Sequence, residues 1–416
     1  MEAAPGYDIT LFGATGFVGR LTAAYLHRRC REEGLTLCLA GRKGEKLADL
    51  ASRLAEQADG HAGAPATLLA DSENVASLRA MARRSRVICS TVGPYARYGT
   101  PVVEAAVREG SDYCDLTGEV QWMRRSADTF AGAAEAAGVR IVHACGFDSV
   151  PSDLGVYLVQ KRLIAETGEP APALRLRLHR QEGGVSRGTL ESMVGLFREA
   201  ASDATVRALL TDPHSLEPHW SPDRGGGETA AGGERVSWKD GASGGWQVPF
   251  LMEEVNRRVV YRTNALSRFL YGRDFRYNEV FVLPPGIGGF LKALAGRSAI
   301  TAGRLLFAFP PTRSLLVALL FPPPGSGPRV AEEGGGYFEA RIEDPLSGRA
   351  YLRIEGDRDP GYGATAIMLG ESAILLAAPR EPDSPAGVIT PAVAFGEALP
   401  RQLSRQGVRF LPTSSN

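Results

Sequence analysis

The segment GATGFVG at residues 13–19 constrains the fold more than any other part of the chain, because of what lies on either side of it. The run DITLF before it is typical of a buried β-strand, and residues 17–30 after it have the pattern of a helix. Glycines at these spacings permit a tight turn, the approach of backbone amides to a pyrophosphate, and close packing of helix on strand. The order therefore predicts a dinucleotide site with the helix N-terminus facing the phosphates. The predicted phosphate-binding residues are Gly13, Thr15, Gly16, Phe17, Val18 and Gly19.

Short apolar runs alternate with helical segments from Tyr7 to Gly146, and the runs are apolar on both faces. This rhythm is typical of βαβ units that form a parallel sheet covered by helices on both sides. The 416 residues exceed the size of about 250 at which single cores usually stop growing, so we expect a second domain. After Pro151 the pattern changes to amphipathic strands and long connections. We therefore predict an α/β chain with a Rossmann-type doubly wound sheet over residues 1–155 and an α+β domain over 156–385.

The balance of charges excludes some classes of partner. Lysine and arginine together number 47, as do aspartate and glutamate, so the formal net charge at pH 7 is +0. A chain without a net field does not attract DNA, RNA or an anionic membrane over long range. We therefore expect no nucleic-acid partner.

The cysteine and histidine residues are not arranged as metal ligands. The five cysteines form no CxxC pair, and most fall in apolar runs that indicate buried strands. The six histidines are scattered, and neither an HExxH nor a GxSxG motif is present. We expect no metal site and no hydrolase chemistry. Buried thiols and a start, MEAAPGYD, without signal-peptide character indicate a cytoplasmic protein.

The region 287–325 is more apolar than a pair of surface helices should be. Two leucine-rich arms flank Pro310 and Pro311, which predicts an apolar helical hairpin without the clean run of about 20 residues that a membrane span needs. Three interpretations stay open: buried core of the second domain, an acyl-chain groove or membrane-surface dock, and a subunit interface. The region favours an apolar substrate, and it makes peripheral membrane contact and a homodimer further predictions.

The end of the second predicted strand distinguishes the two nicotinamide coenzymes. An NAD site usually offers an acidic residue there for the ribose 2′-hydroxyl, whereas this strand ends LCLAGRKGEKL. The guanidinium of Arg42, with Lys43 beside it, suits a 2′-phosphate, so we predict NADP as the cofactor. Asp71 ends the third strand and is expected near the adenine. The residues expected beneath the nicotinamide ribose follow the fourth strand and are Thr91, Val92, Gly93 and Pro94.

Candidates for proton transfer follow the strands that end near the predicted nicotinamide. Tyr95 is expected to donate a proton or polarise a carbonyl, and the alternative is a packed aromatic that holds its loop. Cys145 and Asp148 follow the sixth strand and are expected to face the crevice between the domains. Asp115 and Glu119 follow the fifth strand and suit hydrogen bonding within their loop equally well.

Several segments together carry a resemblance to a known family. They are GATGFVG, the AGR after the second strand, STVGPYARYG, YCDLTGE, HACGFDSVPSDLG, DPGYGATAIMLGESA and GVITPA. In these segments the chain resembles the saccharopine dehydrogenase-like oxidoreductases, and the nearest branch contains the trans-acting enoyl reductases of complex lipid biosynthesis. The resemblance covers most of the chain and is densest in residues 1–155 and 359–398. It implies NADP as hydride carrier and a C-terminal segment, 386–416, that returns to the Rossmann domain.

These observations lead to the hypothesis of an NADPH-dependent enoyl reductase that acts on an unsaturated polyketide or fatty-acyl intermediate delivered by a carrier or synthase. One alternative is a saccharopine-type amino-acid oxidoreductase, which needs a cationic pocket for several carboxylates in the second domain. Another is a non-catalytic, lipid-associated scaffold that binds NADP without turnover. The packing of residues 287–325 would distinguish these hypotheses. The non-catalytic scaffold predicts that this hairpin is exposed and not buried against the nicotinamide crevice.

Overall fold

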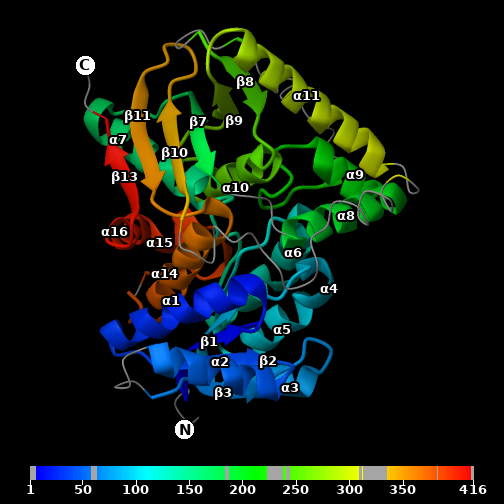
Figure 1. The fold of residues 1–416 in the computed structure, drawn as a ribbon, viewed down its shortest axis with the longest axis vertical. Helices are drawn as coiled ribbons and strands as arrows, with labels where there is room; N and C mark the ends of the chain where they lie inside the picture. Colours follow the sequence, from blue (N-terminus) through cyan, green and yellow to red (C-terminus); the bar gives the residue numbers. More distant parts are fainter. Residues whose placement is uncertain are drawn as a thin grey trace.

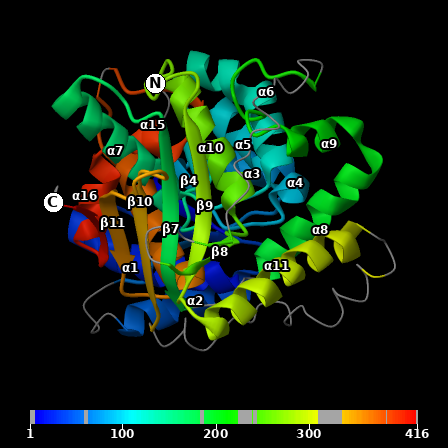
Figure 2. The same cartoon turned by 90° about the horizontal axis from the view of Figure 1, so that it is seen from above.

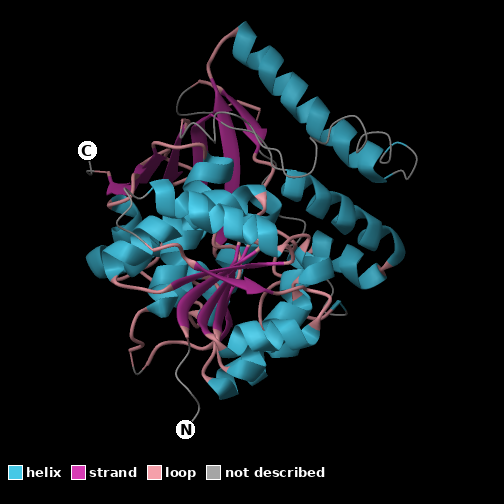
Figure 3. Cartoon of the chain, turned by 60° about the horizontal axis from the view of Figure 1, so that its bottom comes forward, coloured by secondary structure: helices cyan, strands magenta, loops and turns pink. Residues whose placement is uncertain are grey.

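The computed structural model describes residues 6–57, 63–182, 187–222, 238–239, 244–308, 312, 335–381 and 383–413. Two β-sheets lie one above the other along the long axis of the molecule, with helices between and around them (Figures 1 and 3). The lower sheet in Figure 1 holds the N-terminal strands, and the upper sheet holds strands from the later part of the chain.

Seven parallel strands form the first sheet in the order β12-β6-β5-β4-β1-β2-β3. Their bounds are β1 (Tyr7–Phe12), β2 (Leu37–Gly41), β3 (Ala66–Leu69), β4 (Ser85–Ser90), β5 (Asp112–Asp115), β6 (Arg140–Val142) and β12 (Gly387–Ile389). The chain winds from β1 to β3 on one side and then from β4 to β6 on the other. Open α/β sheets bind ligands at the carboxyl ends of the strands where this reversal occurs. The predicted doubly wound sheet is confirmed.

Helices cover both faces of this sheet, which explains why its strands are apolar on both sides. On one face lie α1 (Phe17–Glu33), α2 (Gly44–Gln57) and α14 (Thr365–Ala377); on the other lie α3 (Val75–Arg83), α5 (Thr100–Glu109) and α6 (Val120–Ala137). Successive residues of β1 alternate between the two cores, because strand side chains point to opposite faces. Leu11 joins the core beneath α1, and Phe12 joins the core beneath α5 and α6.

The C-terminal part of the chain returns to the first domain, as the resemblance implied. β12 pairs in parallel with β6, and α14 packs on α1, β4 and β5. The expected boundaries need correction, however, because α14 falls inside the range 156–385 assigned to the second domain, and β13 (Val408–Pro412) joins the second sheet. Almost every residue of α14 is buried. A helix that is buried all round has no amphipathic stripe to predict its neighbours.

Six strands form the second sheet in the order β13-β11-β10-β7-β9-β8. The remaining bounds are β7 (Ala173–Glu182), β8 (Trp246–Pro249), β9 (Arg276–Leu283), β10 (Tyr337–Glu343) and β11 (Ala350–Gly356). β7 and β9 pair in parallel, and the other neighbours are antiparallel. Helix α7 (Val150–Thr167) packs on β10 and β11, and α10 (Glu253–Leu266) packs on β9. The predicted α+β architecture is confirmed.

The other face of the second sheet carries charged side chains. On β10, Ala340 and Ile342 are buried in the core. Glu339 and Arg341, which alternate with them along the strand, form an ion pair at 2.9 Å on the opposite face. The side chain of Arg341 is 42% exposed, so this face meets solvent. The remaining helices are α4 (Tyr95–Tyr98), α8 (Arg187–Ser202), α9 (Ala204–Thr211), α11 (Ile287–Ala308), η3 (Pro360–Ala364), α15 (Pro391–Phe395) and α16 (Ala398–Ser404).

The first arm of the predicted apolar hairpin is helix α11, which extends along the outside of the second domain (Figures 1 and 2). Its buried side packs on β8, where Ala293 is fully covered, but Ile287 is 80% and Leu291 57% exposed. The described arm is therefore not a buried core element. The second arm lies outside the described residues, apart from Thr312. No helix within the described ranges is both long and apolar enough to cross a membrane.

Candidate functional site

Residues 13–19, called the glycine turn below, form a connection between β1 and α1 that leaves no room for side chains. Gly13 has a φ of 88°, in the left-handed region that favours glycine. A Cβ atom at Gly13 would lie 2.7 Å from Cγ2 of Val92, and a Cβ atom at Gly19 would lie 2.1 Å from the carbonyl oxygen of Gly13. The backbone therefore requires glycine at both positions.

The start of α1 has the properties of an anion site. Gly16 precedes the helix without a side-chain cap, and the first turn contains no acidic residue. Aligned peptide dipoles and unpaired amides give such a helix end partial positive charge. The rings of Phe17 and Tyr362 meet edge to face at a centroid distance of 4.8 Å, so η3 borders the glycine turn. The glycine turn fits the pyrophosphate of a dinucleotide.

Arg42 and Lys43 directly follow β2 at the same edge of the sheet. Both side chains are exposed, and neither takes part in an ion pair within the described ranges. Gly41 before them is buried and offers no carboxylate to a ribose. A guanidinium without a protein partner suits a 2′-phosphate. Asp71 follows β3 nearby in the strand order, and its Oδ1 accepts the amide of Glu73 at 3.1 Å, so its carboxylate also orders its own turn.

The residues after β4 reach across to the glycine turn. The Thr91 amide donates to the carbonyl of Phe12 at 2.9 Å, and its Oγ1 donates to the carbonyl of Gly13 at 3.2 Å. Pro94 ends this loop, 91–94, and precedes α4. The structure therefore brings together the predicted phosphate-binding residues and the predicted nicotinamide-ribose residues.

Tyr95 points into the protein, so its prediction as a proton donor is wrong. The side chain is 4% exposed, and its hydroxyl donates to the carbonyl of Ser90 at 3.0 Å. Its ring stacks on Trp122 at a centroid distance of 5.4 Å. Burial raises the pKa of this hydroxyl well above its ordinary value, and the charge of Asp115 adds to the rise. Tyr95 acts as the packed aromatic that holds the loop.

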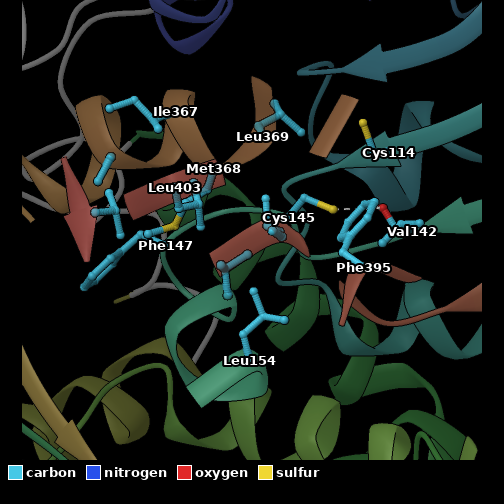
Figure 4. Close-up of a cluster of buried hydrophobic side chains, with 14 of the residues drawn as sticks. Cys114, Val142, Cys145, Phe147, Leu154, Ile367, Met368, Leu369, Phe395 and Leu403 are labelled. Atoms are coloured by element: carbon cyan, nitrogen blue, oxygen red, sulfur yellow. Dashed lines mark hydrogen bonds between the residues drawn. The ribbon is translucent and has the colours of Figure 1, made fainter. Parts of the chain in front are cut away.

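Cys145 belongs to the hydrophobic core, which overturns its prediction as a crevice residue. It lies among Cys114, Val142 and Phe395 (Figure 4). Its thiol is fully buried and donates only weakly to the carbonyl of Val142 at 3.5 Å. Burial raises the pKa of the thiol well above its ordinary value, so the reactive thiolate is disfavoured. Because the side chain is fully buried in this core, it cannot reach a substrate.

Asp148 has the properties of an acid that can release a proton. It is partly exposed in the connection between β6 and α7, and its carboxyl has no hydrogen-bond or ion-pair partner among the described residues. Burial raises the pKa of this carboxyl to about 6. The next residue, Ser149, donates from Oγ to Oδ1 of Asn256 on α10 at 3.0 Å, so this connection meets the second domain. Of the three predicted catalytic residues, Asp148 alone is partly exposed, whereas Tyr95 and Cys145 are buried.

Glu279 is a buried carboxylate that sequence reasoning missed. It accepts hydrogen bonds from Ser152 Oγ at 2.6 Å, Tyr277 OH at 2.7 Å and Asn256 Nδ2 at 2.9 Å. Burial is the main cause of its raised pKa. The donors come from α7, β9 and α10, so no local motif connects them. The available signal is an acidic residue in the alternating inward series Tyr277, Glu279 and Phe281 of β9.

A second buried network lies at the carboxyl ends of β5 and β6. His143 joins Asp115 Oδ2 through Nδ1 and Ser126 Oγ through Nε2, each at 2.8 Å. Ser126 is 1% exposed and cannot meet a substrate, so this serine–histidine–aspartate arrangement orders the interior. Asp115 also accepts the Thr117 amide at 3.0 Å, as predicted for a loop hydrogen-bonder. Within the described ranges, no three or more His, Cys, Asp or Glu side chains are grouped to hold a metal ion.

Two segments that carry the family resemblance meet beside this network. The amide of Phe147 donates to Thr365 Oγ1 at 3.1 Å. A Cβ atom at Gly146 would lie 3.2 Å from Cγ2 of Thr365, so the small residue permits the contact. The HACGFDSVPSDLG and DPGYGATAIMLGESA segments therefore build one structural unit at the carboxyl edge of the first sheet.

Comparison with known proteins gives consistent similarities. The profile of the saccharopine dehydrogenase NADP-binding domain matches residues 9–142. A trans-acting enoyl reductase of Mycobacterium tuberculosis (strain ATCC 25618 / H37Rv) is 38% identical over 419 residues, covering 97% of this chain and 96% of its own. A second chain from that strain, provisionally given the same name, is 39% identical over 437 residues and 99% of each chain. Apo saccharopine dehydrogenase (L-Glu forming) from Saccharomyces cerevisiae superposes with a TM-score of 0.48 and 11% identity, covering 98% of this chain and 100% of its own.

Proposed function

The chain belongs to the family of the trans-acting enoyl reductases, and from this premise we propose that it uses NADPH to reduce a carbon–carbon double bond in an unsaturated polyketide or fatty-acyl intermediate. It is an NADP-dependent oxidoreductase with a Rossmann fold. The observation that carries the proposed reaction is Asp148, a carboxyl without a described protein partner, with a raised pKa, in a connection whose next residue, Ser149, hydrogen-bonds to Asn256 of the second domain. Such a group can supply the proton that reduction requires.

The reaction needs a hydride and a proton. When bound, NADPH would supply the hydride for the β-carbon of the enoyl group, and the electron pair of the double bond would then take up a proton at the α-carbon. We assign the proton to the carboxyl oxygen of Asp148, which becomes a carboxylate and is reprotonated from solvent. Its raised pKa supports this assignment, because an acid with a pKa near the working pH both holds and releases its proton.

The cofactor contacts follow from the same edge of the sheet. We propose that the glycine turn and the start of α1 hold the pyrophosphate, and that Arg42 and Lys43 hold the 2′-phosphate. The free amides and the unpaired cations support this assignment. Loop 91–94 would then lie beneath the nicotinamide ribose, and Asp71 would border the adenine.

An assay with defined substrates tests the reaction. We expect loss of NADPH absorbance with a long-chain α,β-unsaturated acyl thioester of N-acetylcysteamine, and no loss with a saturated thioester. Turnover with a free amino acid and an oxo acid instead would assign the chain to saccharopine-type chemistry. NADPH binding without turnover of any of these would favour the non-catalytic scaffold.

The pH dependence tests the role of Asp148. Since the protonated carboxyl is the active form, kcat/KM should be constant below about pH 6 and should fall about tenfold per unit above it. Asp148→Asn should lower kcat/KM and flatten the profile. The same raised pKa affects stability: the contribution of the carboxyl to folding is present below its ordinary pKa of 3.8 and is lost as the pH rises through about 6. Asp148→Asn should therefore stabilise the fold at pH 8.

Glu253 provides the matched control. Burial raises the pKa of its carboxyl to about 7, but the carboxyl is paired with Arg257 at 3.3 Å. Glu253→Gln should leave the descending limb of the profile in place. If this limb disappears in Glu253→Gln and persists in Asp148→Asn, the proton donor is not Asp148.

We also propose that the exposed side of α11 contacts an anionic membrane, near which an apolar acyl intermediate would be available. Ile287, Leu291 and Leu294 are exposed at helical spacing. From residue 280 to residue 331 the chain contains lysine and arginine but no acidic residue. Apolar side chains combined with positive charge are typical of helices that lie in a membrane surface.

Vesicle sedimentation tests this contact. The protein should sediment with phosphatidylglycerol vesicles and much less with phosphatidylcholine vesicles, and Leu291→Glu should abolish the difference. If neither vesicle binds and Leu291→Glu instead converts a dimer to a monomer in size-exclusion chromatography, the face is a homodimer interface. The homodimer and the cytoplasmic location stay predictions.

A further inference from the structure

The side chain of Glu119 turns away from its own helix and binds the chain that follows loop 91–94. Glu119 precedes α6, yet its carboxylate does not cap that helix. Instead, Oε1 accepts the Tyr95 amide at 2.7 Å and Oε2 accepts the Ala96 amide at 2.9 Å. The carboxylate therefore holds the backbone immediately after Pro94.

The same carboxylate also binds the second domain. Ser192 Oγ, on helix α8, donates to Oε1 of Glu119 at 2.8 Å. Glu119 is 2% exposed, and no cation lies within ion-pair distance of it among the described residues. A buried carboxylate depends on hydrogen-bond donors when no opposite charge is near. Two amides of the first domain and one hydroxyl of the second thus share one acceptor group.

The other described hydrogen bonds and ring contacts that hold this part of the chain come from the first domain. Thr91 is tied to the glycine turn through the carbonyl of Gly13. The ring of Tyr95 stacks on Trp122 of α6, whose Nε1 donates to Thr100 Oγ1 at 3.0 Å. Through Glu119, helix α8 is therefore linked to the backbone next to loop 91–94.

We infer that Glu119 is a positioning residue that sets loop 91–94 in register with helix α8, so that the nicotinamide and the acyl substrate are aligned together. This inference rests on the proposed role of loop 91–94 in holding the nicotinamide ribose. It assigns no contact between Glu119 and the reacting atoms. Its consequence is that the hydrogen bond from Ser192 of the second domain to Glu119 of the first affects catalysis through the cofactor loop.

Three variants separate this role from ordinary packing. Ser192→Ala should leave the NADPH dissociation constant within about twofold of wild type and lower kcat about tenfold, since hydrogen bonds to charged groups contribute about 1.5 kcal/mol or more. Ser192→Thr keeps the hydroxyl and should restore kcat. Glu119→Gln has one acceptor oxygen instead of two, so it should both weaken NADPH binding and lower kcat, each about tenfold.

The control uses another contact between the same two helices. Arg125 of α6 pairs with Glu199 of α8 near the surface and does not touch loop 91–94. Glu199→Gln should therefore resemble wild type in both constants. The double variant Glu119→Ala with Ser192→Ala should be no worse in kcat than Glu119→Ala alone, because without the carboxylate the hydroxyl has already lost its acceptor.

Hydrogen exchange gives a readout that does not depend on turnover. In Glu119→Gln, one of the two amides loses its acceptor oxygen, so the amide of Tyr95 or of Ala96 should exchange faster while those of β4 and α6 remain protected. Unchanged exchange at these two amides in a folded variant would overturn the positioning role, even if no substrate is ever turned over. Equal effects of Ser192→Ala and Glu199→Gln on kcat, or additive effects in the double variant, would overturn the link to α8.

Discussion

The two sheets differ in whether backbone or side chains provide their polar groups. In the first sheet both faces are covered by helices, and the candidate cofactor site consists of strand ends, glycine turns and free amides. In the second sheet one face packs on α7 and α10 while the other carries ion pairs in solvent. Its polar interior depends on side chains such as Glu279, whose partners come from three separate elements. A site built from backbone can be predicted from a local sequence motif. A network of side chains such as that of Glu279 depends on tertiary contacts, which no local motif indicates.

The largest expected effect concerns the glycine turn. A Cβ atom at position 19 would overlap the Gly13 carbonyl at 2.1 Å, and this neighbour is backbone that cannot swing aside. Gly19→Ala should therefore abolish measurable NADPH binding by fluorescence titration. A Cβ atom at Gly132 in α6 would meet no other atom within 4 Å, so Gly132→Ala should keep NADPH binding and raise stability by about 0.5 kcal/mol. NADPH binding by a folded Gly19→Ala protein would contradict the backbone account of the site.

The next effect concerns the contact between α1 and α14. Glu371 is fully buried and accepts hydrogen bonds from Tyr25 OH at 2.5 Å and Arg29 Nε at 2.7 Å. Glu371→Ala leaves a buried cation with fewer partners, so it should lower the free energy of unfolding by about 3 kcal/mol. Glu371→Gln retains an acceptor and should cost less in the same urea titration. A loss of unfolding free energy smaller than that expected for a surface ion pair would show that the stability of the first domain does not depend on the contact between α1 and α14.

The third effect concerns coenzyme choice. Removal of an unpaired guanidinium from a 2′-phosphate should weaken NADPH binding about tenfold or more, because charge-assisted hydrogen bonds contribute about 1.5–3 kcal/mol. We expect Arg42→Ala to show this loss in titration while NADH binding stays the same. Lys46, which is exposed one turn further along, is the control, and Lys46→Ala should leave both affinities unchanged. Equal losses for the two coenzymes would assign Arg42 to another part of the cofactor.

The smallest effect is expected on the open face of the second sheet. Arg341 pairs with Glu339 at 2.9 Å, but the arginine side chain is 42% exposed. Solvent-exposed pairs contribute about 0–1 kcal/mol, and salt screens them. Glu339→Gln should therefore change the urea midpoint little, and less still at high salt. A loss as large as that of Glu371→Ala would remove the contrast between the two sheets.

The sequence predicted what local patterns determine. Alternating runs and helices indicated the doubly wound sheet, and glycine spacing indicated the turn that the structure shows. The position of α14 could not be predicted, because its residues are buried all round and show no preferred face. Tyr95 and Cys145 were misjudged because a residue after a strand can point to the crevice or to the core. The sequence pattern gives its position in the chain but not the direction of its side chain.

Glu119 and Glu279 show a second limit. Glu119 stood in a motif that resembles the family, yet its bond to Ser192 spans 73 residues. Glu279 accepts from Asn256 across 23 residues and from Ser152 across 127. Contacts at such separations depend on how the two domains pack. They become visible only when the fold is known.

The central claim is that the first domain delivers a hydride to the β-carbon of an enoyl substrate held by the second. The most direct measurement uses NADPH that carries deuterium at the transferred position, a long-chain enoyl thioester, and mass spectrometry of the product. The account predicts a saturated thioester with deuterium on the β-carbon and an equal amount of NADP⁺. Deuterium on the carbonyl carbon, or unchanged thioester in the presence of tightly bound NADPH, would contradict it.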